Sequence, residues 1–199
     1  MGAFNDPLSK KIIIDVSWQE NNKNLFLQKE ILISAWNLAY WKQTDFSGGE
    51  GFDIWSQDGY YSEDDGNIDN SGSFLKLKEI ATSTYPSSGY LISSAFFVQN
   101  ASAFDAIFWE ENEVDNCDGC EIRVQIKTAS DNSGSPGVWT STWSGPQGDD
   151  GNETDYFSKN TGELINLSHN GDEWIKYKII FLTNTLASPE LSNISIFYQ

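Results

Sequence analysis

Residues 173–198, EWIKYKIIFLTNTLASPELSNISIFY, decide the fold class. In the first part, the apolar or aromatic residues at positions 175, 177, 179 and 181 alternate with Lys176 and Lys178. The second part repeats the pattern around Asn193 and Ser195, and a polar segment with Pro189 separates the two. Alternation of this kind, rich in β-branched and aromatic residues, is typical of half-buried strands. The chain ends one residue later, so we expect the C-terminal strand to close a sheet.

Length and charge bound the class of protein. A chain of 199 residues suffices for one large β-domain, or for a domain of about 150 residues with a small extension. The net charge of −17 argues against nucleic acid and anionic membranes, since both are bound through clustered Lys and Arg. The acidity fits a soluble, exposed surface, with bound cations as the alternative.

The composition favours an extracellular protein. Aromatic residues make up 14%, including eight Trp, beside one Met and one His, which suits a secreted β-sandwich better than a cytosolic enzyme. The sequence has no signal peptide and no run of 18 apolar residues. The chain is either cytosolic or has lost a targeting segment ahead of Met1, and we expect the second.

The chain in order predicts an all-β protein. Residues 12–18 read as a strand and 19–24 as a turn, whereas 25–36 fits a strand or one helical face. The turn favours a β-hairpin, so we expect a hairpin extension over residues 1–44 and a β-sandwich over 45–199. Long irregular connections and about eight strands predict a two-sheet jelly roll. The expected strands of the sandwich are 73–80, 89–98, 103–110, 121–128, 138–143, part of 156–167, and the C-terminal pair.

Two parts of the chain resemble known families. The hairpin pattern with Val16, Trp18 and Glu20 resembles the end of the globular head in type IV pilin-like and pseudopilin-like proteins. In those proteins an apolar N-terminal helix anchors and polymerises the subunit, so the resemblance implies a membrane or pilus anchor that is missing from this chain.

The second resemblance covers more than half the chain. Residues 88–198 resemble a jelly-roll module of secreted, multidomain and pilin-like proteins from uncultivated bacterial lineages. The matching segments are 88–94, 122–128, 143–146, 156–157, 174–178 and 188–191. This resemblance implies an extracellular, non-catalytic fold, related in shape to carbohydrate-binding and discoidin-like sandwiches, and no particular ligand.

Two short motifs suggest a disulfide and a metal site. In Cys117-Asp118-Gly119-Cys120, Asp-Gly favours a tight hairpin turn that would bring the cysteines within disulfide reach, with reduced thiols or redox and metal use as alternatives. Asp65, Asn67 and Asp69 match the first three ligands of a calcium loop, which predicts a structural Ca²⁺.

The sequence departs from the full calcium-loop motif at two positions. Asn70 replaces the expected glycine and Lys76 the expected glutamate, so a solvated acidic loop is the alternative. Residues 148–153 offer a second candidate set of oxygen ligands.

Aromatic residues supply candidate ligand-binding platforms, because exposed Trp and Tyr rings stack on sugars. Trp139 and Trp143 are four apart and would share one face of a strand, whereas Trp55, Tyr60 and Tyr61 lie in a predicted loop. The alternative is burial in the core, which we expect for Trp109 and Trp174.

No residue pattern singles out an enzyme. His169 is the one His of the chain and lies in a predicted turn, where solvation or capping is the usual role. The many carboxylates, such as Glu110, Glu111, Glu113 and Asp115, do not define a catalytic pair.

The sequence therefore predicts a non-catalytic, extracellular or cell-surface domain, pilus-associated and structural or adhesive. Its expected partners are glycans or other surface and pilus subunits, and not nucleic acid. A carbohydrate-binding module of a secreted protein is the alternative, and an enzyme built on the sandwich comes third.

Overall fold

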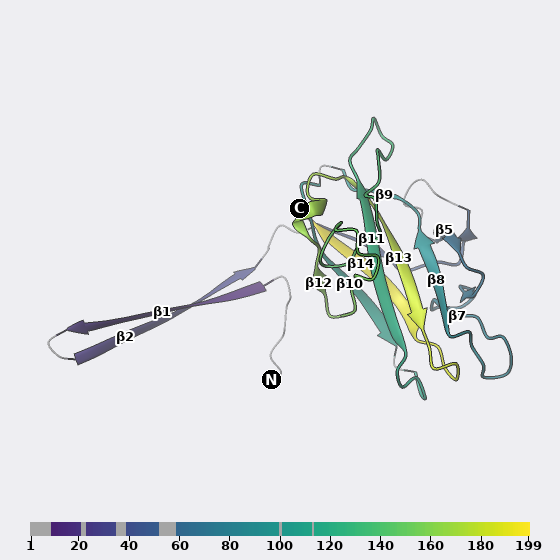
Figure 1. The fold of residues 1–199 in the computed structure, drawn as a ribbon, viewed down its shortest axis with the longest axis horizontal. Helices are drawn as coiled ribbons and strands as arrows, with labels where there is room; N and C mark the ends of the chain where they lie inside the picture. The colour runs from purple at the N-terminus through teal and green to yellow at the C-terminus, as the bar shows by residue number, and fades with distance from the viewer. Residues whose placement is uncertain (1–8, 21–22, 35–38, 52–58, 100, 113) are drawn as a thin grey trace. The chain divides into compact units, whose positions relative to one another are not determined.

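The computed structural model describes residues 9–20, 23–34, 39–51, 59–99, 101–112 and 114–199 (Figure 1). The chain divides into two compact units, Met1–Leu38 and Ala39–Gln199. In the first unit, β1 (Ser9–Glu20) and β2 (Lys23–Ser34) pair antiparallel over their whole length, from Ser9 opposite Ser34 to Glu20 opposite Lys23. The hairpin predicted for this region is confirmed.

The boundary between the units lies before β3 (Ala39–Gln43) and not at 44/45. The backbone of β3 pairs with β14 (Glu190–Tyr198), from Ala39 opposite Tyr198 to Gln43 opposite Ile194. Residues 39–43 therefore belong to the sandwich, because their backbone hydrogen bonds are made there.

The smaller sheet has four strands in the order β12 (Glu163–Leu164), β10 (Phe104–Asn112), β14 and β3. The C-terminal strand lies between β10 and β3, so it does not close the sheet as expected. A bulge interrupts the β10–β14 register, where Glu110 faces Asn193 and Glu111 faces Leu191. The extra residue, Ser192, allows both Leu191 and Ile194 to be buried although they are three positions apart.

The larger sheet begins at one edge with β11 (Glu121–Ala129), followed by β13 (Trp174–Leu182) and β8 (Ser88–Ser93). β5 (Tyr60–Asp64) and β4 (Gly49–Glu50) extend it beyond β8, and β9 (Phe96–Phe97) also pairs with β13. A separate short pair consists of β6 (Ile68–Asp69) and β7 (Lys76–Leu77). The all-β prediction is confirmed: the helical structure of the described residues is one 3-10 turn, Leu167–His169. No helix in the described ranges is long and apolar enough to span a membrane.

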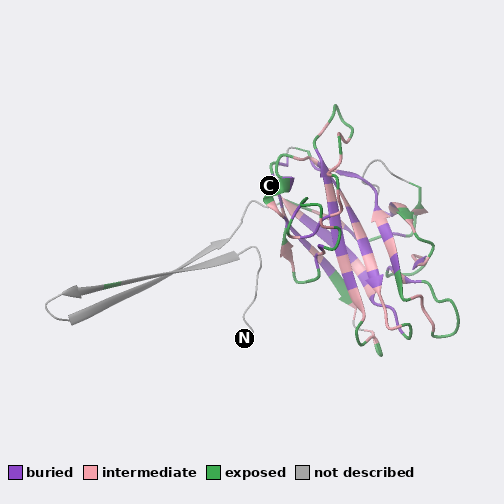
Figure 2. Cartoon of the chain, viewed as in Figure 1, coloured by how far each residue is buried: buried purple, intermediate pink, exposed green. Residues whose placement is uncertain are grey.

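The hydrophobic core fills the space between the two sheets (Figure 2). Ile175, Tyr177, Ile179 and Phe181 of β13 are fully buried, as the alternation predicted. They join Ile107, Ile194 and Ile196 of the smaller sheet in one cluster. Trp109 and Trp174 are also buried, as expected. The architecture is an all-β sandwich, and its jelly-roll connectivity stays a prediction.

Side chains also link the two sheets directly. The rings of Trp41 in β3 and Phe96 in β9 have centroids 3.7 Å apart, and Phe96 stacks on Tyr177 at 6.0 Å. The Tyr177 hydroxyl donates a hydrogen bond to the side-chain carbonyl of Gln43, and both residues are buried. These contacts fix β3 against the larger sheet.

The outer edge of β11 is covered by an irregular segment, residues 137–157, which we call the covering segment. The predicted strand at 138–143 is wrong, because this backbone meets β11 at separate points and not along a ladder. Ile126 and Ser144 exchange backbone hydrogen bonds of 2.9 and 3.1 Å, and Val124 and Phe157 exchange bonds of 3.0 and 2.9 Å. Most of the polar backbone at this edge is therefore paired.

Buried polar side chains hold the covering segment in place. The amide nitrogen of Gln125 donates to the carbonyls of Glu153 at 2.9 Å and Asp155 at 3.0 Å. The Asp155 carboxylate in turn accepts from the backbone N–H groups of Gly145 and Gln147. A Cβ at Gly145 would lie 2.6 Å from the Tyr156 nitrogen, so the backbone at these two positions of the covering segment approaches as closely as glycine allows.

Candidate functional site

An aromatic groove lies on the outer face of the smaller sheet. It is built on Tyr40 of β3, Phe197 of β14 and Phe108 of β10, with ring centroids 5.6 Å apart for the first pair and 4.9 Å for the second. Tyr40 is 61% exposed. Phe108 and Phe197 also line a cleft of about 240 Å³ together with Trp109, Glu110, Asn160, Asn193 and Ser195.

Polar groups lie beside these rings. The Asn193 amide donates to a Glu110 carboxylate oxygen at 2.6 Å, and the Lys42 ammonium lies 3.9 Å from the other oxygen. Aromatic faces next to fixed amide and carboxylate groups can bind sugars, since rings contact C–H groups while polar groups bind hydroxyls. The sequence prediction missed this groove. The one available signal was Phe197, which is out of phase with the buried Ile194 and Ile196.

Trp139 and Trp143 are brought together on the outer face of the larger sheet, although the covering segment that carries them is not a strand. Both are half-buried. The Lys176 ammonium lies 4.5 Å from the Trp139 ring centroid and 5.8 Å from that of Trp143, and the Lys127 ammonium lies 5.6 Å from Trp143. Cation–π contacts of this kind contribute about 0.5–1 kcal/mol each at exposed sites. The rings therefore hold lysines, which changes their predicted role as simple stacking platforms.

The predicted loop platform does not form as expected. Trp55 lies outside the described residues, and Tyr60 is half-buried in β5. Tyr61 is 4% exposed, and its hydroxyl donates to Asp64 at 2.7 Å. Burial, reinforced by the hydrogen bond to Asp64, raises the pKa of the Tyr61 phenol. The prediction that Tyr61 offers a ring to a ligand is wrong, because β5 points it into the core opposite Ser93 of β8.

The predicted calcium ligands make hydrogen bonds within their own loops. Asp65 accepts from the backbone and side-chain amides of Asn67 at 3.1 and 3.3 Å. Asp69 accepts from the backbone and hydroxyl of Ser71, and these bonds lower the pKa of its carboxyl. In the described parts of the chain, no three His, Cys, Asp or Glu residues are grouped to hold a metal. Calcium binding at Asp65, Asn67 and Asp69 stays a prediction.

The second acidic loop, 148–153, shapes the covering segment. The Asp149 carboxylate accepts hydrogen bonds from the hydroxyls and backbone N–H groups of Ser141 and Thr142. These bonds, chiefly that of the Thr142 hydroxyl, lower the pKa of Asp149. Asp150 accepts from the Asn152 backbone at 2.8 Å. A cation site here also stays a prediction.

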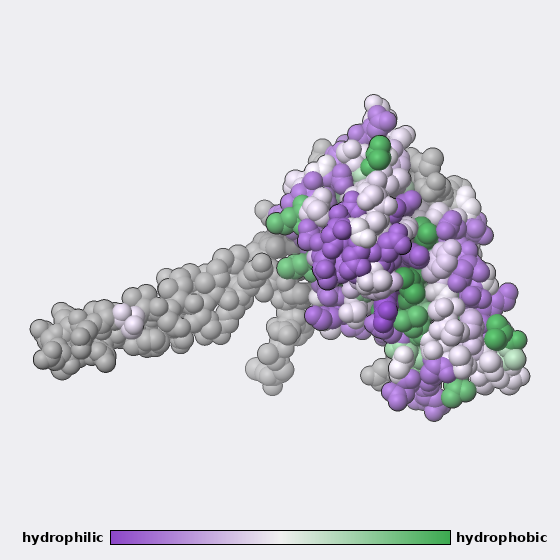
Figure 3. All heavy atoms as spheres, in the orientation of Figure 1, coloured by the Kyte–Doolittle hydropathy of each residue, from purple (hydrophilic) through white to green (hydrophobic). Residues whose placement is uncertain are grey.

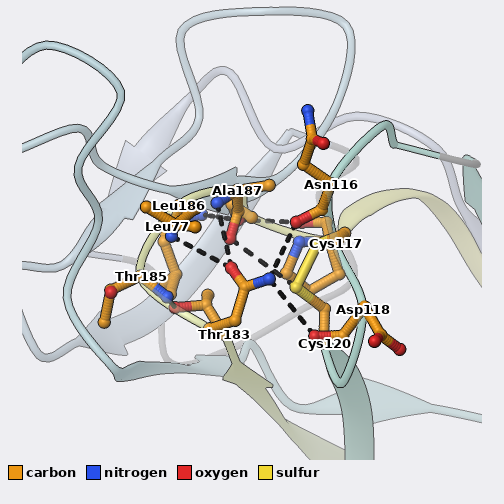
Figure 4. The surroundings of a disulfide bond; sticks show 12 residues. Leu77, Asn116, Cys117, Asp118, Cys120, Thr183, Thr185, Leu186 and Ala187 are labelled. Atoms are coloured by element: carbon orange, nitrogen blue, oxygen red, sulfur yellow. Dashed lines mark hydrogen bonds between the residues drawn. A yellow bond between two sulfur atoms is a disulfide. The ribbon is translucent and has the colours of Figure 1, made fainter.

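Cys117 and Cys120 form a disulfide, with Cα atoms 5.2 Å apart (Figure 4). The predicted pairing is present, but the cysteines do not face each other across a hairpin, because β10 ends at Asn112 and β11 begins at Glu121. The Asn184 amide donates to the carbonyls of Asn116 at 2.7 Å and Asp118 at 3.2 Å. The disulfide turn is thus attached to the connection between β13 and β14. A cysteine pair of this kind is compatible with an extracellular protein.

An open acidic cleft of about 650 Å³ lies beside the disulfide. Its wall contains Glu111, Asn112, Val114, Asp115, Asn116, Cys117, Asp118, Cys120, Asn160 and Pro189. Burial raises the pKa of Glu111, while a hydrogen bond from the Trp109 indole opposes the shift. The negative lining suits a cation better than an anion, but no described cluster there has the arrangement of a metal site.

His169 is fully buried, so its predicted role as a solvated turn residue is wrong. Its Nδ1 lies 2.8 Å from the Thr128 hydroxyl and its Nε2 lies 3.2 Å from the Ser144 hydroxyl. Thr128 donates in turn to Asp172 at 2.5 Å. Thr128 separates His169 from Asp172, whereas in a catalytic triad the acid contacts the histidine directly, and Ser144, Thr128 and His169 are all 0% exposed. The network pins the covering segment to β11 and to the turn at Leu167–His169.

Comparison with known protein families, curated proteins and solved structures finds no match for this chain. The interpretation of the two outer faces therefore depends on their own geometry.

The buried His169 predicts an acid-sensitive fold. Burial lowers the pKa of His169 below its usual 6.5, against smaller opposing effects of Asp172 and Asp149. Because the unfolded chain binds a proton more readily, this group removes stability as the pH falls below about 6.5. Urea unfolding at pH 7.5 and pH 5.5 should give a lower free energy of unfolding at pH 5.5 for the natural chain.

His169→Gln is the matched control, since it keeps polar atoms at the position without titrating. We expect it to lower stability at pH 7.5 and to reduce the loss between the two pH values. An equal loss in both proteins would contradict the assignment of the pH dependence to His169.

Proposed function

We propose that this chain is an extracellular, non-catalytic surface domain with an adhesive or structural role, as in a pilin-like or other surface protein. The observation that carries the proposal is the placement of its candidate binding features. The aromatic groove and the Lys176–Trp139 contact lie on outer sheet faces, whereas the hydrogen-bonded Ser144 and His169 are sealed from solvent. A scaffold with open faces and a closed interior is suited to binding.

The disulfide and the two family resemblances also support this proposal. Disulfides persist in oxidising compartments and are rare in the cytosol. The Cys117–Cys120 bond closes a short loop, so its role is to fix the turn that Asn184 contacts and not to hold the domain together. The pilin-like part of the proposal depends on the hairpin pattern around Val16 and Trp18.

Exposure at the cell surface is the first test of this proposal. Antibodies against residues 39–199 should label intact cells of the organism that produces the protein, and external protease should remove the label. Cys117 and Cys120 of the protein taken from these cells should not react with thiol reagents before reduction. Labelling that appears only after lysis, with reactive thiols, would contradict the proposal.

A second candidate function, carbohydrate binding, is favoured by the aromatic groove. Tyr40 presents an exposed ring on the smaller sheet, next to Phe197 and the Asn193–Glu110 pair. The groove lacks a dominant charge, because Glu110 is balanced by Lys42, so a neutral glycan chain suits it.

Tyr40→Ala should weaken binding to any neutral glycan that an array identifies. Loss of one stacking ring removes about 1 kcal/mol or more, which is a fivefold to tenfold drop in affinity. Ile80→Ala is the control, because Ile80 is 65% exposed and is not one of the residues that form the groove. Equal binding by the two variants would contradict a role for the groove, and silence across a broad neutral array would remove this candidate.

A further inference from the structure

The hydroxyl of Ser195 in β14 is the exception among the buried polar side chains that the structure describes. Ser195 is 9% exposed, and none of the described residues forms a hydrogen bond with its side chain. The other buried polar side chains all take part in hydrogen bonds: Gln43, Ser93, Ser94, Gln125, Thr128, Ser144, Asp155, His169, Ser188 and Asn193. Burial of a hydroxyl without a partner costs free energy. Ser195 therefore indicates a partner that the chain itself does not supply.

Ser195 lines the cleft of about 240 Å³ in the aromatic groove. The strand register places it opposite Phe108 of β10 on one side and opposite Lys42 of β3 on the other. Phe197, which also lines the cleft, follows two positions along β14 and so lies on the same face of the sheet. The hydroxyl is thus a small polar group beside two aromatic rings.

Asn193 adds a second polar atom to the same cleft. It is 6% exposed, and its side-chain nitrogen donates to Glu110 at 2.6 Å. Because a carboxylate can only accept, this bond fixes which end of the amide faces Glu110. The side-chain oxygen of Asn193 accepts no hydrogen bond from the described residues. The cleft therefore offers one hydroxyl, which donates and accepts, and one carbonyl oxygen, which only accepts.

The spacing of these two groups suits a ligand amide. Ser195 and Asn193 are two positions apart on a strand, which separates them by about 6.6 Å. A hydroxyl oxygen forms hydrogen bonds of about 2.8 Å, so a single hydroxyl of a ligand is too small to bind both groups. An amide carries its N–H and its C=O on opposite sides and reaches about 2.9 Å from each. It can donate to Asn193 and accept from Ser195 at the same time.

The aromatic rings of the cleft are held in position. The rings of Phe108 and Phe197 meet edge to face, with centroids 4.9 Å apart and planes inclined by 64°. Gly162, with a φ of +108°, lies so close to Phe108 that a Cβ at this position would overlap the ring. Rings that are fixed before binding lower the entropic cost of binding. A methyl group attached to the bound amide would be removed from water against these rings.

The same face carries a row of apolar residues across all four strands. Leu164, Ala106, Phe197 and Tyr40 follow one another in the register from β12 to β3. Leu164 and Tyr40, at the two ends, are 51% and 61% exposed and are three strand spacings apart, roughly 14 Å. Figure 3 shows the molecule from the side of the larger sheet, where hydrophobic residues form small separate patches among hydrophilic ones. The row on the smaller sheet gives a polysaccharide a path across the strands and past the cleft.

We propose that the cleft binds the acetamido group of an N-acetylated amino sugar within a neutral polysaccharide. Ser195 donates to the acetamido carbonyl, Asn193 accepts from its N–H, and neighbouring sugar rings stack on Tyr40. The cleft is smaller than the roughly 300–1,000 Å³ of drug-sized sites, so it takes about one sugar residue with its substituent. This inference rests on the neutral-glycan function of the aromatic groove and names the sugar class that the groove selects.

A sugar fits the cleft better than a polypeptide. A peptide also carries amides, but it repeats them at every residue, and each one needs its own partners when it is buried. The cleft offers one unpaired hydroxyl and one unpaired carbonyl oxygen, which is enough for a single amide. The exposed ring of Tyr40 beside them provides a stacking surface for the flat face of a sugar.

Calorimetric titration of the full chain with two β-1,4-linked hexasaccharides tests this proposal. The hexamers of N-acetylglucosamine and of glucose differ only in that an acetamido group replaces one hydroxyl of each sugar. The natural chain should bind the N-acetylated hexamer at least tenfold more tightly. Ser195→Ala should remove most of this preference and change the affinity for the glucose hexamer little, whereas Tyr40→Ala should weaken binding of both sugars.

Ser87→Ala is the matched control, because Ser87 is exposed and is not one of the residues that line the cleft. It should bind both hexamers like the natural chain. Ser195→Ala removes a hydroxyl that has no partner among the described residues, so it should unfold at a temperature no lower than that of the natural chain. A loss of sugar preference in this variant is then not a loss of fold.

Four results would overturn the proposal. Equal affinity of the natural chain for the two hexamers would leave the groove as a neutral-glycan site without selection of the acetamido group. A preference that persists in Ser195→Ala would show that the cleft is not its source. Displacement of the N-acetylated hexamer by an equal concentration of N-acetyl-trialanine amide would make the occupant a peptide. Binding of neither hexamer would remove the acetamido proposal, while the glycan array still decides whether the groove binds another neutral sugar.

Discussion

The structure depends on how the outer edge of β11 is covered. An open edge of a sheet presents unpaired N–H and C=O groups that invite aggregation. Here an irregular segment supplies the partners, through Ser144 at Ile126 and Phe157 at Val124. Gln125 and the His169 network hold this segment from both sides. A network of buried polar groups that satisfy one another fixes one arrangement of a chain that has no regular secondary structure of its own.

The candidate binding surface of the larger sheet follows from this constraint. Trp139 and Trp143 lie on the covering segment, and the bonds at Thr140 and Ser144 determine where their rings meet Lys127 and Lys176. Trp139 and Trp143 do not lie together through alternation along a strand. They lie together because the loop that carries them is hydrogen-bonded to the edge of β11 at points on either side of each ring. The aromatic groove on the smaller sheet is built differently, from three regular strands.

The sequence pattern predicted the features that depend on residues close together in the chain. The alternation of Ile175, Tyr177 and Ile179 identified β13 and its buried face, and Cys117-Asp118-Gly119-Cys120 identified the disulfide. The pattern did not indicate hydrogen-bond or strand partners that are far apart in the sequence. His169 lies in a polar turn, and its burial depends on Thr128 and Ser144, which are 41 and 25 residues away. Local pattern could not indicate that β3 crosses to β14 either, because that pairing joins the two ends of the sandwich sequence.

The most direct measurement is amide hydrogen exchange of the covering segment. If it is fixed to β11 as described, the N–H groups of Ser144 and Phe157 are as protected as those in the centre of β13. The amide of Ser133, in the exposed turn before the segment, should exchange rapidly by comparison. Exchange of Ser144 and Phe157 as fast as Ser133 would mean that the edge of β11 is open in solution. The described positions of Trp139 and Trp143 against Lys127 and Lys176 would then lose their basis.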